Sequence, residues 1–126
     1  MQEFQRLVNA AHKAGMEAGT EASPRAMVVG TPTTPLGNNI DRSKPTYYVA
    51  DGVCGMAWVE VRPRNCKFAR WLVEVGLGKS SDYDKAIVIW VREFGQSLER
   101  KARYADAFAD VLSDAGIRAT SRSRID

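Results

Sequence analysis

Few side chains in this sequence are of the types that carry out a reaction. The 126 residues include one histidine, His12, and two cysteines, Cys54 and Cys66, which lack the spacing of a redox or zinc motif. A Ser-His-Asp triad, a Cys-His pair or a zinc site of these residues would need His12. Its place on an expected helix beside Lys13 favours a solvated side chain instead. We therefore expect a binding protein that is not an enzyme and that uses neither a cofactor nor a metal ion.

The residues best suited to binding are arginines near the end of the chain. The net charge is +3, from 18 basic and 15 acidic residues, and Arg118, Arg122 and Arg124 against Asp126 account for +2 of it. If 117–125 is a strand, alternation places the three arginines on one face, in a row suited to phosphate oxygens. The alternative is a solvated edge strand whose charges prevent aggregation. The modest charge excess favours a small anionic ligand over a nucleic-acid polymer.

A second candidate is the turn before the last expected helix, which contains Gln96 and Ser97. Free N–H groups at a helix start, together with the helix macrodipole, attract an anion. The alternative is an ordinary capped helix, because every helix has such a terminus. Arg103, on the first turns of that helix, and Arg25 are second-rank candidates for contacts with phosphate.

Aromatic side chains provide a further element, since their rings can stack on a nucleobase. Tyr83, in a loop rich in serine and aspartate, is the best candidate for such stacking. Trp58, Trp90, Tyr47 and Tyr48 lie on or beside expected strands, where such rings most often pack in the core. The sequence therefore predicts a ligand site that combines the loop tyrosine, the arginine row and the turn before the last helix.

The elements that position these residues indicate an α+β fold. Helices are expected at 3–19 and 66–75 and from the N-cap Ser97 to Gly116, and strands at 26–29, 47–50, 53–61, 85–92 and 117–125. The order α-β-β-β-α-β-α-β predicts a small, mainly antiparallel sheet with its helices packed on one face. Asp51 and Gly52 predict a two-residue hairpin turn between 47–50 and 53–61. The residues of 53–61 expected on one face are Ala57, Val59 and Val61, and those expected on the other are Met56, Trp58, Glu60 and Arg62.

A chain of this length fits a single domain, residues 1–126. Within it we expect 1–20 to be an N-terminal helix that serves in oligomerisation and 26–126 to be the α+β core. No apolar run approaches the roughly 20 residues of a membrane-spanning helix. The first residues are polar where a signal peptide has an apolar stretch, so we expect a cytosolic protein without membrane contact.

Four segments resemble a known family of short phage proteins. They are Asp51–Val59 (DGVCGMAWV), Ile89–Val91 (IWV), Gln96–Phe108 (QSLERKARYADAF) and Ser123–Asp126 (SRID). In these segments, in length and in having an N-terminal helix before a small sheet, the chain is similar to the first-described family of phage anti-Thoeris sponge proteins. The resemblance spans nearly the whole chain.

The resemblance implies binding without catalysis, in the cytoplasm of the infected bacterial host. Members bind the cyclic ADP-ribose isomer made by the TIR-domain enzyme of the Thoeris defence, and some also sequester cyclic oligonucleotide signals. They are homo-oligomers, dimers or higher assemblies up to a hexamer, with pockets partly between subunits. By the same resemblance Tyr83 would stack on the base, and Gln96 and Ser97 would bind phosphate and ribose. Gly95 stands where the family has a polar residue.

Together, the residues and the resemblance predict a small sponge protein that removes a cyclic nucleotide signal by binding it. Arg118, Arg122 and Arg124 would then contact the phosphates. The alternative is a small basic phage accessory protein that binds nucleic acid through the phosphate contacts of its terminal strand.

Overall fold

The computed structural model describes residues 2–22, 27–29, 47–49 and 54–125. Its helices are α1 (Gln2–Glu21), α2 (Lys67–Glu74) and α3 (Leu98–Asp114). Its strands are β1 (Met27–Val29), β2 (Tyr47–Val49), β3 (Gly55–Arg62), β4 (Lys79–Ser81), β5 (Ala86–Trp90) and β6 (Arg118–Ile125). The α+β class is confirmed, and the order of elements agrees with the expected one except that β4 is an additional strand.

The main sheet has four antiparallel strands in the order β4-β5-β3-β6. The short strands β1 and β2 pair with each other in a separate two-stranded sheet. The expected hairpin between 47–50 and 53–61 is therefore wrong. Both edges of β3 are occupied by β5 and β6, and β2 takes β1 as its partner instead. The turn residues Asp51 and Gly52 lie outside the described residues.

The expected loop after α2 also contains more order than its composition indicates. Lys79–Ser81 forms β4 and pairs with the first residues of β5. Its side chains are polar and largely exposed, so the segment lacks the alternation of apolar and polar residues that would predict a strand. A turn of four residues, 82–85, then leads into β5. The strand could be predicted only from its pairing with β5, which the local sequence does not encode.

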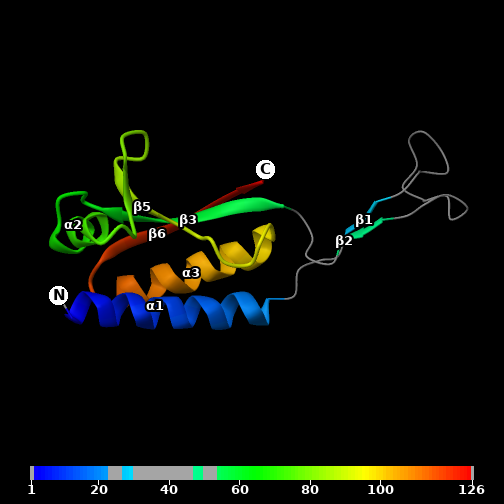
Figure 1. The fold of residues 1–126 in the computed structure, drawn as a ribbon, viewed down its shortest axis with the longest axis horizontal. Helices are drawn as coiled ribbons and strands as arrows, with labels where there is room; N and C mark the ends of the chain where they lie inside the picture. Colours follow the sequence, from blue (N-terminus) through cyan, green and yellow to red (C-terminus); the bar gives the residue numbers. More distant parts are fainter. Residues whose placement is uncertain (1, 23–26, 30–46, 50–53, 126) are drawn as a thin grey trace, which may run out of the picture.

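The helices α1 and α3 cover one face of the main sheet (Figure 1). The residues of β3 that alternation assigns to the core, Ala57, Val59 and Val61, are at most 1% exposed. α3 packs directly on β3 and β6, and α1 runs antiparallel along α3 (Figure 1). The core therefore lies between β3 and α3, with α1 and α2 closing it.

The ends of the helices follow the local sequence. Ser97 is the N-cap of α3, and its Oγ accepts a hydrogen bond from the backbone N–H of Arg100 at 3.3 Å. Gly116, which follows α3, has a φ of 86° and takes the left-handed conformation typical of a helix C-terminus. Both residues were expected in these roles.

Two glycines of α1 lie where the helix packs closely against aromatic rings. Gly15 and Gly19 predict a weakened helix end, yet α1 continues through both to Glu21. Both are buried, and a Cβ atom on Gly15 would lie only 2.6 Å from Cδ2 of Tyr104. The glycines allow α1 to approach two aromatic rings closely. Gly15 faces Tyr104 of α3, and Gly19 faces Phe94, which follows β5.

Candidate functional site

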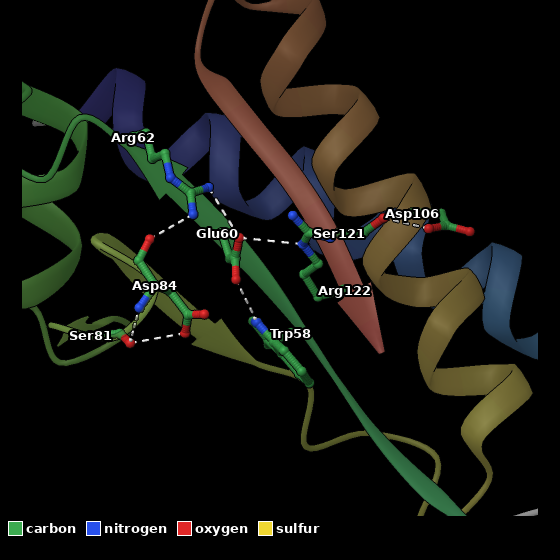
Figure 2. A network of polar contacts seen from close by, with 8 residues as sticks. All are labelled: Trp58, Glu60, Arg62, Ser81, Asp84, Asp106, Ser121 and Arg122. Carbon is green, nitrogen blue, oxygen red and sulfur yellow. Dashed lines mark hydrogen bonds and ion pairs between the residues drawn. The ribbon is translucent and has the colours of Figure 1, made fainter. Parts of the chain in front are cut away.

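The candidate site is the face of the main sheet that α1 and α3 leave uncovered, here called the open face (Figure 2). It is formed by the even-numbered side chains of β3, β5 and β6, namely Met56, Trp58, Glu60, Arg62, Ala86, Val88, Trp90, Arg118, Thr120, Arg122 and Arg124. Residues paired across antiparallel strands point to the same side of the sheet. The open face therefore carries arginine and tryptophan side chains together.

The arginine row predicted for the last strand lies on this face. Arg122 pairs with Trp58, Arg124 with Met56 and Arg118 with Arg62. On the opposite face of β6, Ser121 donates a hydrogen bond to Asp106 of α3, as Figure 2 shows. The alternation expected for 117–125 is confirmed.

A buried carboxylate organises two of the arginines. Glu60 is 2% exposed, and its Oε1 lies 3.0 Å from Nη1 of Arg62 and 3.5 Å from Nε of Arg122 (Figure 2). Trp58 Nε1 donates a hydrogen bond to Glu60 Oε2 at 3.0 Å, and Arg62 donates another to the backbone oxygen of Asp84 at 2.7 Å. One carboxylate thus positions guanidinium groups from two strands and one indole ring.

The charge state of Glu60 results from opposing effects. Burial by itself raises the pKa of this carboxyl, while the hydrogen bond from Trp58 and the charges of Arg62 and Arg122 lower it. The net effect is a pKa below the ordinary value of 4.5. Glu60 is therefore ionised at neutral pH and remains paired with the arginines.

Replacing Glu60 with glutamine is expected to lower the free energy of unfolding by about 1–3 kcal/mol near neutral pH, because Arg62 and Arg122 lose their counter-ion. The pKa of Glu60 is lower in the folded state, so its contribution is present above the unfolded value of 4.5 and is lost as the pH falls through the folded value. Urea unfolding of both proteins between about pH 7 and pH 3 should show their difference shrinking at low pH. A difference independent of pH would contradict this role of the charge.

Two tryptophans lie side by side next to the arginines. The ring centroids of Trp58 and Trp90 are 5.0 Å apart, with the planes inclined by 47°. Trp90 is 45% exposed, which leaves part of its ring free for stacking. The expectation that Trp90 packs in the core is therefore wrong, although the alternation of β3 correctly placed Trp58 opposite the core residues. Trp90 could be assigned to this face only once β5 was known to pair with β3.

The other predicted site residues lie elsewhere. Tyr83 is 96% exposed in the turn between β4 and β5, near the Arg62 end of β3. Gln96 and Ser97 lie at the Gly55 end, where Gly55 N–H donates a hydrogen bond to the backbone oxygen of Gln96 at 3.0 Å. The seven residue steps along β3 separate these ends by roughly 23 Å. Within one chain, Tyr83 and this turn are therefore not parts of one pocket.

The remaining candidates do not extend the arginine row. The Ser97 hydroxyl is buried and serves as the cap of α3. Arg103 is exposed on α3, which packs against the covered face of the sheet. Arg25 lies outside the described residues. Of the predicted site residues, the structure brings together Arg118, Arg122 and Arg124 on one strand face.

Comparisons with protein-family models, curated proteins and solved structures give no match. In the described part of the chain, no helix is long and apolar enough to span a membrane. Among the same residues, no group of three or more histidine, cysteine, aspartate or glutamate side chains is placed to hold a metal ion.

Proposed function

We propose that the protein binds a nucleotide-like anion on the open face and releases it unchanged. The observation that carries this proposal is the cross-strand row of Arg122, Trp58 and Trp90, which places one arginine and two tryptophans side by side on the open face. A nucleotide offers phosphate oxygens for arginine and a planar base for an exposed ring. Arg118 and Arg124 form no ion pair with any residue that the structure describes, so both are available to phosphate.

The resemblance to anti-Thoeris proteins supports a more specific proposal. In it the protein is a phage sponge in the cytoplasm of the infected host, and its ligand is a cyclic ADP-ribose isomer or a cyclic oligonucleotide. Lowering the free concentration of such a signal keeps the defence effector unoccupied without any chemical step. The proposed homo-oligomer gives Tyr83 and Gln96 a role, because a second subunit can bring one end of its sheet to the open face of the first.

A second candidate function has its own observation in its favour. An open sheet face with aromatic rings beside basic side chains is also the arrangement by which small domains bind single-stranded nucleic acid. Trp58 and Trp90, with the arginines of the edge strand β6, form such an arrangement. In this case the ligand is a polymer that extends beyond the face.

Titration with a cyclic ADP-ribose isomer and with single-stranded RNA at two salt concentrations distinguishes these functions. We expect the cyclic nucleotide to bind with a weak salt dependence, because it has few phosphates, and to be recovered intact after heat denaturation of the protein. A polymer that contacts many phosphates loses affinity steeply as salt rises. Tight, salt-sensitive RNA binding without binding of the cyclic nucleotide would favour the second function, and recovery of a hydrolysed nucleotide would contradict both.

A further inference from the structure

A cleft opens beside β5, on the side of the strand that β4 covers only in part. β4 pairs with residues 86–88, so Ile89 and Trp90 have no neighbouring strand on that side among the described residues. The cleft has a volume of about 290 Å³ and lies between α1, the turn after α2, the end of β5 and α3. Its apolar walls are formed by Val8, Leu72, Leu77, Ile89 and Phe108. This size and lining are typical of a site for a small molecule.

A hydrogen bond holds the imidazole of His12 at the rim of the cleft. His12 Nδ1 lies 2.6 Å from the hydroxyl of Tyr104. Burial, together with the charge of Glu93, raises the pKa of the Tyr104 hydroxyl. His12 is exposed, as expected from the sequence, and it is also hydrogen-bonded to Tyr104 at this rim.

Charges of both signs lie at the same rim. The Glu93 carboxylate is held in place, since its Oε1 accepts a hydrogen bond from the Arg92 backbone N–H at 3.1 Å and its Oε2 lies 3.7 Å from His12 Nδ1. The exposed guanidinium of Arg92 forms no ion pair with any other residue that the structure describes. Arg92 attracts a negatively charged group at this rim, and Glu93 partly opposes it, so one negative charge is tolerated better than two.

We propose that this cleft is a second ligand site, which binds a small planar apolar molecule carrying one negative charge, such as an aromatic carboxylate. The ring of the ligand lies against the apolar walls. Its carboxylate lies at the rim, beside Arg92 and the imidazole of His12, where the guanidinium can form a charge-assisted hydrogen bond. The cleft shares only Trp90 with the open face, so the charged side chains of the two sites are different.

Binding of 2-naphthoate, followed by NMR, tests this site. The chain has a single histidine, so the imidazole C–H signals report on His12 alone. We expect 2-naphthoate to shift these signals to saturation. Acetate has the charge without the ring, and 2-naphthamide has the ring without the charge. Both are expected to bind at least about tenfold more weakly, because each lacks one of the two interactions.

Matched variants locate the ligand. Arg92→Gln should weaken 2-naphthoate binding at least about tenfold, and Glu93→Gln should strengthen it by removing the opposing charge. Asn9 is an exposed residue at the cleft, so Asn9→Phe should fill the space and abolish binding in a folded protein. Ala10→Phe, on the neighbouring exposed position of the same helix, is the control and should leave binding unchanged.

Several results would overturn the proposal. These are an unshifted His12 signal at millimolar 2-naphthoate, equal affinity in Arg92→Gln and the unaltered protein, or weaker binding in Glu93→Gln. Binding that survives Asn9→Phe but is lost in Arg122→Ala would place the anion on the open face and would also overturn it. The nucleotide titration has a separate ligand and separate residues, so the failure of one proposal is distinguishable from the failure of the other.

Discussion

Replacing Arg122 and Arg124 together with alanine is expected to weaken binding of a cyclic ADP-ribose isomer at least about a hundredfold. Each charge-assisted hydrogen bond to an ionised group contributes about 1.5–3 kcal/mol, and about 1.4 kcal/mol corresponds to a factor of ten in affinity. Both arginines lie on the open face, beside Met56 and Trp58 of the neighbouring strand. Calorimetric titration of the variant and the unaltered protein measures the loss.

The double variant is expected to remain folded. Arg122 is 59% exposed, and its removal leaves Glu60 paired with Arg62 at the shorter distance of 3.0 Å. Arg70→Ala is the matched control, because Arg70 is an exposed arginine of α2 that lies off the open face. Unchanged affinity in the double variant, or an equal loss in Arg70→Ala, would show that the ligand does not bind at the arginine row.

The site could be predicted from the sequence where it depends on neighbours along one strand. Alternation along 117–125 was sufficient to place Arg118, Arg122 and Arg124 on one face, because side chains of a strand alternate whatever its partners are. The same rule separated Trp58 and Glu60 from the core residues of β3. The ion pair between Glu60 and Arg62 also follows from two residues on one face of one strand.

Features that depend on pairing between distant segments could not be predicted in this way. The Asp51-Gly52 signal favours a hairpin, but β3 is paired on both sides by β5 and β6. The contact between Trp58 and Trp90 requires the register of β3 with β5. A turn signal describes only a few residues, whereas strand order depends on which pairings bury most apolar surface.

The cleft beside β5 also depends on contacts between distant segments, so it could not be predicted from the sequence. His12 and Tyr104 are separated by 92 positions in sequence, and only the packing of α1 on α3 brings the imidazole to the hydroxyl. Gly15 provided a weak signal, since a glycine on the apolar stripe of a helix can mark a close approach to another element. Its partner could not be identified without the structure.

Replacing Tyr104 with alanine is expected to lower the free energy of unfolding by about 3–5 kcal/mol, as for other large aromatic side chains removed from a core. The residue is 5% exposed, and its ring packs against Phe108 and Phe94, with centroid distances of 5.8 and 6.3 Å. The ring also fills the space that Gly15 leaves in α1. Urea unfolding followed by circular dichroism measures the loss.

The variant Tyr104→Phe distinguishes the contribution of the aromatic ring to stability from that of the hydroxyl. It keeps the packing against Gly15 and removes only the hydrogen bond to His12, so the free energy of unfolding should fall by only about 1 kcal/mol. In Tyr104→Ala, by contrast, α1 loses its main aromatic contact with α3 and should exchange its amide hydrogens faster than β3 does. If the alanine and phenylalanine variants were equally stable, the ring would not be what holds α1 to α3. The contact would then have to depend on the small residues of α1 and on the Arg100 hydrogen bonds to the backbone oxygens of Gly19 and Thr20.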